Sequence, residues 1–382
     1  MQKRIRIVSI GIIIIVLLIS VIVLNNNANN KHTFKKDGIL YALSLDGKSI
    51  TSFPSKGLYK ANVSCEGADG RWLYDDWKLA IENITGDVSC DIKFETITKT
   101  YLNDYITGLA GTTQGTGQVV NENGYRYEGK NPNNYVWFNN EYWRIIGVFD
   151  SNSHGQESKN LVKIIRADIL DGLAWHKSGE NDWTVASLNL LLNGAYYNAQ
   201  DGTSSGYCCG YYSITSNCDY TKKGIQDGYR SMISNVTWYL GGYPSVDATA
   251  EAFYGYERGT TVYDGNSTST TGYIGLMYPS DYGYSVLSSS CTRTKNLGSY
   301  ISSTCAGASW LYGKGYEWTL SSASSVNNYV FLLGEQGDLR NNRAISGFDA
   351  RPVLYLDASV YKIDGEGTLD KPYIIGMWEP LV

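Results

Sequence analysis

Trp318-Thr319-Leu320-Ser321 opens the stretch that decides the fold of the C-terminal half of this chain. It is followed by Tyr329–Leu333 and by Gly347-Phe348-Asp349-Ala350-Arg351-Pro352-Val353-Leu354-Tyr355-Leu356. The pattern predicts a strand, a hairpin that turns over Gly334–Asp338, and a closing strand that is apolar at nearly every position. We expect this closing sheet to be a scaffold, with any function on the loops that it supports.

The composition favours strands and turns and argues against nucleic acid as a partner. Among 382 residues, 32 are tyrosine, 41 glycine and 10 tryptophan, and such residues favour short strands and turns over long helices. A net charge of −5 offers no basic surface for nucleic acid. Only 3 histidines are present, which leaves little material for a histidine-based metal site or catalytic triad.

An apolar run from Ile7 to Leu24 follows the basic residues Lys3, Arg4 and Arg6. A helix of this length would just cross the hydrocarbon core of a bilayer. The alternative is a cleaved secretory signal peptide. Because the run exceeds a usual signal core and no small-x-small site follows Leu24, we predict an uncleaved single-pass anchor in the cell membrane. The positive charges would keep the N-terminus cytoplasmic and place the remaining chain outside the cell.

A small disulfide-linked β-sandwich domain, interpreted as a spacer, is predicted over residues 37–97. The alternation of apolar and polar residues that is typical of half-buried strands occurs in Tyr59–Cys65, Trp77–Glu82 and Val88–Glu95. Cys65 and Cys90 both fall on the apolar faces of their strands. We therefore expect a disulfide between them, because a core of this size gains much from a covalent link.

A larger α+β domain is predicted over residues 119–357. Asn139-Asn140 separates the apolar runs Tyr135–Phe138 and Glu141–Phe149, and asparagine tolerates the positive φ of a tight hairpin turn. Apolar residues at helical spacing predict helices in Trp183–Tyr197, Lys223–Val236 and Ala248–Tyr254. The predicted division is an anchor (1–24), a tether (25–36), the β domain (37–97), a short helix and linker (98–118), the α+β domain (119–357), and a C-terminal hairpin and tail (358–382).

Blocks of the larger domain follow one another as in a known sequence group. Trp143-Arg144-Ile145-Ile146-Gly147, the Trp183–Tyr197 segment, Tyr273–Tyr284 and the closing stretch resemble an uncharacterised domain of surface proteins from gut-dwelling Firmicutes and related bacteria. The ending is also similar, more distantly, to C-type lectin-like and formylglycine-generating-enzyme-like folds. The resemblance implies a C-type-lectin-like α+β fold and a surface location, and it carries no known activity. The cysteine pair of the enzymes and the calcium motifs of the lectins are not matched.

Seven cysteines on an extracellular chain predict disulfides. Besides Cys65–Cys90, we expect a bond between Cys291 and Cys305 and one from Cys218 to either Cys208 or Cys209. One thiol would stay unpaired. A soft-metal site at the vicinal pair is the alternative, although thiolate sites usually need three or four ligands.

Two further sites are predicted near the closing sheet. An aromatic surface for a sugar or a protein would use Trp310, Tyr312, Tyr316, Tyr211 and Tyr212, unless these rings pack the core instead. A weaker calcium site would use Glu335, Asp338, Asn341, Asn342 and Asp349, although hairpin tips are rich in such residues for turn reasons alone. We otherwise expect no cofactor. Arg144 and Arg351, inside apolar strands, predict buried ion pairs or contacts with loop carbonyls.

The sequence therefore predicts a membrane-anchored extracellular protein whose larger domain binds a glycan or a protein ligand. One alternative is an extracellular hydrolase that acts on cell-wall or host material through carboxylates such as Asp281, Glu317 or Glu335. Another is a structural component of the envelope. The sequence contains no nucleophile elbow, phosphate loop or dinucleotide fingerprint, so we expect binding rather than catalysis.

Overall fold

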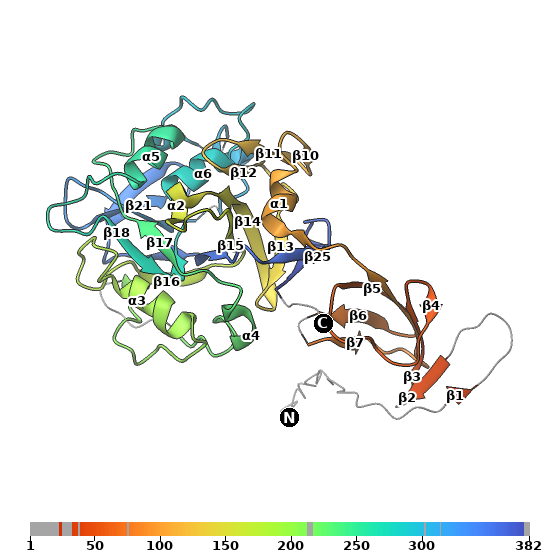
Figure 1. Ribbon diagram of the computed structural model, residues 1–382. Coiled ribbons are helices and arrows are strands. Elements are labelled where there is room, and N and C mark those ends of the chain that lie inside the picture. The colour runs from red at the N-terminus through yellow and green to blue at the C-terminus, as the bar shows by residue number, and fades with distance from the viewer. Residues whose placement is uncertain are drawn as a thin grey trace, which may run out of the picture. The chain divides into compact units, whose positions relative to one another are not determined.

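The computed structural model describes residues 23–24, 33–36, 39–74, 76–211, 217–301, 303–313 and 315–377. These residues form two compact units, which we call the small unit and the large unit. The small unit ends at Lys99, and the large unit runs from Thr100 to Met377 (Figure 1).

The small unit is built from β-strands. Its main sheet has the order β1 (Val23–Leu24), β2 (Thr33–Lys36), β3 (Ile39–Leu45), β8 (Ser89–Thr96) and β5 (Tyr59–Glu66), with β4 (Lys48–Ser49) paired to β3. A separate hairpin consists of β6 (Asp69–Leu73) and β7 (Lys78–Glu82). Cys65 and Cys90 lie directly opposite each other in the antiparallel β5–β8 pair and form the expected disulfide.

The predicted membrane anchor lies outside the described residues, except for Val23 and Leu24. These two residues form β1, which pairs with β2. Among the residues that the structure describes, no helix is long and apolar enough to cross a membrane.

The large unit contains an 11-stranded sheet. Its main path is β10 (Thr113–Gln114), β11 (Gly117–Asn121), β12 (Tyr125–Gly129), β14 (Glu141–Phe149), β13 (Tyr135–Phe138), β26 (Tyr373–Gly376), β25 (Tyr361–Asp364) and β9 (Thr100–Tyr101). A branch leads from β14 through β15 (Leu161–Arg166) and β24 (Val353–Leu356) to β19 (Ile274–Gly275). Asn139 and Asn140 have φ angles of 57° and 58°, which confirms the tight turn predicted between β13 and β14.

A second sheet of the large unit has the order β16 (Leu170–Ala174), β23 (Gly347–Ala350), β20 (Glu317–Ser322), β21 (Tyr329–Leu333) and β22 (Leu339–Arg343). The hairpin predicted over Gly334–Asp338 is the β21–β22 connection. The predicted single closing strand is two strands in different sheets, because β23 ends at Ala350 and β24 begins at Val353. Proline offers no N–H for a ladder, so Arg351-Pro352 is where the chain passes between sheets.

The helices of the large unit are short. They are α1 (Leu102–Thr107), α2 (Ser151–His154), α3 (Ser187–Leu191), the π-helix η1 (Leu192–Tyr196), α4 (Asp227–Arg230), α5 (Ala250–Glu257), α6 (Pro279–Ser285), and the 3₁₀ turns η3 (Leu297–Ser299) and η4 (Ala306–Ala308). A two-stranded ladder joins β17 (Val236–Tyr239) to β18 (Ser269–Gly272). Figure 1 shows β14 and β15 in the middle of the unit, with α5 and α6 on one side and α3 and α4 on the other.

The prediction of an α+β, C-type-lectin-like fold is wrong. The described part of the chain is mostly β, with 37% of its residues in strands and 14% in helices. The segment Lys223–Val236, expected to be one helix, contains only the four residues of α4, and Val236 already belongs to β17. Gly224 marks a close contact within this segment, because a Cβ there would lie 2.5 Å from the carbonyl oxygen of Tyr196. The apolar residues of this segment, although spaced as in a helix, belong mostly to irregular chain that packs against the sheets.

The segments predicted as linker and tail are parts of the large unit. The linker, residues 98–118, contains β9, α1 and β10, and the first two residues of β11. The tail, residues 358–382, contains β25 and β26, and β26 pairs with β13 in parallel. Because β9 pairs with β25, the two ends of the unit meet in one sheet.

Candidate binding site

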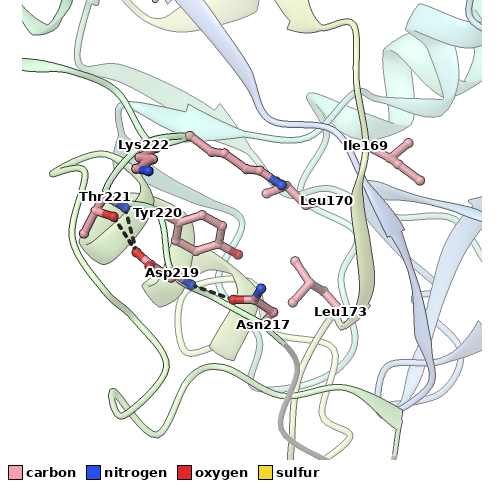
Figure 2. Close-up of a pocket in the computed structure, with 9 residues that line it drawn as sticks. Ile169, Leu170, Leu173, Asn217, Asp219, Tyr220, Thr221 and Lys222 are labelled. Carbon is pink, nitrogen blue, oxygen red and sulfur yellow. Dashed lines mark hydrogen bonds between the residues drawn. The ribbon is translucent and has the colours of Figure 1, made fainter. Parts of the chain in front are cut away.

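A surface pocket of about 460 Å³ lies between β16 and the segment 217–223 (Figure 2). We call it the β16 pocket. Its walls combine apolar, hydroxyl, amide and charged side chains: Ile169, Leu170, Leu173, Asn217, Asp219, Tyr220, Thr221, Lys222 and Lys223. A mixture of apolar wall and a few convergent polar groups is typical of small-molecule sites.

The apolar part of the pocket comes from two directions. Leu170 and Leu173 are provided by β16, and Tyr220 comes from the opposite wall. All three side chains are buried, and Figure 2 shows the Tyr220 hydroxyl pointing toward the two leucines. The Tyr220 ring packs edge-on against Tyr196, with 5.3 Å between the ring centroids. A saccharide ring or a peptide side chain in the pocket would therefore contact apolar side chains that are held in place by packing.

The polar part of the pocket is an ordered turn. Asp219 Oδ1 accepts hydrogen bonds from the backbone N–H and the hydroxyl of Thr221, at 3.0 and 2.7 Å. These two bonds hold the pKa of Asp219 below its ordinary value, so the carboxylate stays charged. Asn217 accepts from the Asp219 N–H at 3.3 Å, and Lys222 and Lys223 are exposed. The rim thus presents two ammonium groups and one carboxylate.

A disulfide bonds the turn at residues 217–223 to the preceding segment of the chain. Cys218 is bonded to Cys208, and the Gly202 N–H donates to the Cys218 carbonyl at 2.9 Å. This resolves the two pairings left open for Cys218 and leaves Cys209 as a buried thiol, whose pKa is raised by its burial. The Ala174 N–H donates to the Cys209 carbonyl at 2.7 Å, so the segment that carries the cysteines runs alongside β16.

One predicted aromatic residue lies near this pocket. Tyr211 is 52% exposed, and its backbone lies against β16 and β23, because a Cβ on Gly347 would be 2.8 Å from the Tyr211 nitrogen and 3.1 Å from the Gly172 oxygen. Tyr207 is also exposed. Tyr212, the other tyrosine predicted here, lies outside the described residues.

The other predicted aromatic residues do not form one exposed platform. Trp310 is buried, donates from Nε1 to the Tyr127 carbonyl at 2.8 Å, and lies under the Arg144 guanidinium, so it belongs to the core. Tyr312 and Tyr316 are half-buried. Tyr312 donates to the Glu335 carbonyl at 2.5 Å, which links the loop that carries Tyr312 to the β21–β22 turn.

The structure does not gather the five predicted calcium ligands into a cage. Asp338 pairs with Arg340 at 2.6 Å, and Asn342 accepts from the Arg343 N–H and the Ser346 hydroxyl. Asn341 and Asn342 are adjacent in β22, so their side chains leave opposite faces of the strand. Glu335 is exposed at the hairpin tip, and Asp349 lies on β23. Among the described residues, no group of 3 or more His, Cys, Asp or Glu is placed to hold a metal.

Glu317 and Arg351, the first a predicted catalytic candidate, form a buried bidentate ion pair. Arg351 Nε and Nη2 donate to the two Glu317 oxygens at 2.7 and 2.8 Å, and Nη2 also reaches the Leu311 carbonyl. Arg144 likewise meets a buried amide, Asn134, at 2.8 Å, and burial lowers its pKa to about 10. Both arginines therefore have the structural contacts predicted for them.

Asp281, another predicted catalytic candidate, is the centre of a buried charge cluster. Arg126 donates to its Oδ1 at 2.9 Å and Lys163 to its Oδ2 at 2.5 Å, and all three side chains are almost completely buried. Although burial would raise the pKa of Asp281, Lys163 and Arg126 hold it below its ordinary value. Next to it, burial raises the pKa of Glu257 to about 7, while Ser280 and Arg258 bind its carboxylate.

The two histidines within the large unit have structural roles. Nδ1 of His154 accepts from the Gln156 N–H at 3.1 Å, and Nδ1 of His176 accepts from the Ser187 N–H at 3.2 Å. Burial lowers both pKa values, so the neutral rings that these bonds require are favoured. If either histidine acted as the general base that activates a nucleophile through Nδ1, it would lose this hydrogen bond.

Several of these residues were not predicted from the sequence. Lys163 was detectable, because a lysine inside the apolar run Val162–Ile165 needs a buried partner. Arg126 and Glu257 carry no comparable signal. The pocket residues 217–223 form a polar turn that resembles many surface turns, and only the neighbouring Cys218 marks it as fixed.

The cysteines support an extracellular setting. The predicted Cys65–Cys90 and Cys291–Cys305 bonds are both present, together with Cys208–Cys218. Three disulfides fit an extracellular or secreted protein, because thiols stay reduced in the cytosol. Comparison of the chain with protein-family models, curated proteins and solved structures found no match.

The ion pair between Glu317 and Arg351 allows a test of whether Glu317 has a structural role. We expect Glu317→Gln to lower the free energy of unfolding of the large unit by about 3–5 kcal/mol, because Arg351 would stay buried without its counter-ion. The matched change Glu335→Gln, on an exposed carboxylate, should alter it by less than about 0.5 kcal/mol. Urea denaturation of both variants measures this, and equal effects would contradict the assignment.

Proposed function

We propose that this protein is an extracellular glycan-binding protein and that the β16 pocket is its binding site. The supporting observation is the combination of an apolar wall with a charged, hydrogen-bonding rim in one surface pocket. Saccharides have apolar C–H faces and many hydroxyl groups, so they match a site of this composition. Tyr220, Leu170 and Leu173 would contact the sugar ring, and Asn217 and Asp219 would bind its hydroxyls.

The charge of the rim favours an acidic sugar. Among the described lining residues, Lys222 and Lys223 are accompanied by one carboxylate, Asp219, which already accepts two hydrogen bonds from Thr221. This small positive region belongs to a chain whose net charge is −5. A carboxylate or sulfate on a saccharide would form charge-assisted hydrogen bonds with the ammonium groups.

Binding is better supported than hydrolysis by the positions of the candidate carboxylates. A glycoside hydrolase needs two carboxyl groups that flank one bond of the substrate. Glu317 and Asp281 are buried in ion pairs, and Glu335 is exposed on the β21–β22 turn. Among the described residues that line the β16 pocket, Asp219 is the one carboxylate.

Glycan binding can be tested with the full chain purified in mild detergent on an array of acidic and neutral saccharides. We expect acidic saccharides to bind, and Lys222→Ala and Lys223→Ala each to lower the affinity about tenfold, the loss of one charge-assisted hydrogen bond. Lys130→Ala, an exposed lysine just after β12, should leave it unchanged. Absence of saccharide binding, or binding that the pocket variants retain in full, would contradict the proposal.

We also propose that the apolar run that begins at Ile7 and precedes β1 anchors the protein in the membrane, with Lys3, Arg4 and Arg6 on the cytoplasmic side. The support is the length and apolarity of the run and the preceding charges. We expect the chain to remain in the membrane fraction after carbonate extraction and to be degraded by protease added outside the cell. A secreted chain whose first residue lies beyond Leu24 would instead establish a cleaved signal peptide.

A further inference from the structure

Lys163 and Asp281 are brought into close contact from distant parts of the chain. Lys163 lies in β15 and Asp281 in α6, 118 residues later. The distance from Lys163 Nζ to Asp281 Oδ2 is 2.5 Å, and both side chains are 1% exposed. An amine and a carboxyl group therefore meet inside the core of the large unit.

Aromatic rings surround the amine and keep water away from it. Tyr278 lies 4.4 Å from Nζ, Tyr355 5.5 Å, and Phe149 and Trp238 slightly further, measured to the ring centroids. Burial lowers the pKa of Lys163 to about 8, even though Asp281 opposes this. Because this pKa still lies above neutral pH, the amine is mostly protonated there, and the unprotonated, nucleophilic form is a minor but accessible one.

The two carboxylate oxygens of Asp281 have different partners. Oδ1 accepts from Arg126 Nη1 at 2.9 Å. Oδ2 accepts from Lys163 and from the Tyr278 N–H, the latter at 2.9 Å as part of the cap at the start of α6. A negative charge that developed on Oδ1 would be stabilised by the guanidinium, as in an oxyanion hole. Oδ2 is in contact with the proton that a leaving water needs.

We propose that Lys163 and Asp281 condense to an intramolecular amide that cross-links β15 to α6. Lys163 and Arg126 favour the ionised carboxylate, so the reaction starts from the minor neutral form of the pair, in which an ammonium proton has passed to Oδ2 along the existing hydrogen bond. In that form Nζ attacks Cγ. The Cγ–Oδ2 bond breaks, a second Nζ proton goes with it, and Oδ2 leaves as water. Oδ1 becomes the amide oxygen and keeps its hydrogen bond from Arg126. The reaction consumes one amine and one carboxylic acid and requires no other reagent.

Two physical effects favour this condensation inside the core. Groups held in a reactive geometry reach effective molarities of about 10⁵–10⁸ M, which offsets the unfavourable condensation of amines with acids in water. The amide also replaces two buried charges, which are costly to desolvate, with a neutral group. The ammonium and the carboxylate disappear together, so the net charge of the cluster around Arg126, Arg258 and Glu257 does not change.

The experiment is an intact-mass measurement on the full chain after denaturation, reduction and alkylation of all cysteines. We expect the wild-type chain to be lighter than its sequence mass by one water. Proteolysis should yield a branched peptide in which the segment containing Lys163 is joined to the segment containing Asp281. Lys163→Arg and Asp281→Ala should each restore the full mass, because neither can form the amide.

Succinimide formation at Asp-Gly sites also removes one water, and the variants distinguish it. A loss of water that persists in Lys163→Arg, or a wild-type chain at full mass that is folded by circular dichroism, would overturn the proposal. The wild-type result decides the matter even if a variant fails to fold. It is also independent of glycan binding, so the two proposals can fail separately.

Discussion

The burial of charge around Asp281 is the constraint on which the large unit depends. One carboxylate at the start of α6 binds Arg126 of β12 and Lys163 of β15, and Glu257 of α5 holds the neighbouring Ser280 through its backbone and its hydroxyl. Isolated buried charges are very costly, so packings that left Asp281, Arg126 or Lys163 unpaired would be disfavoured. Apolar contacts alone would tolerate other packings of such short helices on the sheet.

The candidate binding site lies on a different part of the same unit. The β16 pocket is formed by the edge strand of the second sheet and by a turn that the Cys208–Cys218 disulfide holds in place. Its polar groups are exposed, whereas the ionisable groups around Asp281 are enclosed. The proposed binding site and the buried charge cluster around Asp281 are thus different regions of the large unit. The Glu317–Arg351 pair lies where the chain passes from the second sheet to the first.

Local sequence patterns predicted several strands, among them β8 and β13, and the turn at Asn139-Asn140, because alternation and turn residues are properties of neighbouring positions. The fold class was not predictable in this way. Helical spacing in Lys223–Val236 could not reveal that Gly224 must lie against Tyr196. The predicted aromatic residues do not line the pocket: Tyr211 lies against β23, which pairs with β16, and Trp310 is in the core. Which loops meet depends on pairings across more than a hundred residues, and those leave no local signal.

Hydrogen exchange, followed by mass spectrometry on the full chain, tests most directly whether the buried charges form the rigid centre of the large unit. If they do, the backbone amides of α6 and β15 exchange only through global unfolding. A helix as short as α6 would otherwise exchange through local opening, without unfolding of the rest of the unit. Amides of the segment 217–223 should exchange much faster. Exchange of α6 at the rate of that surface segment would contradict the account, because it would mean that the charges around Asp281 do not hold the helix on the sheet.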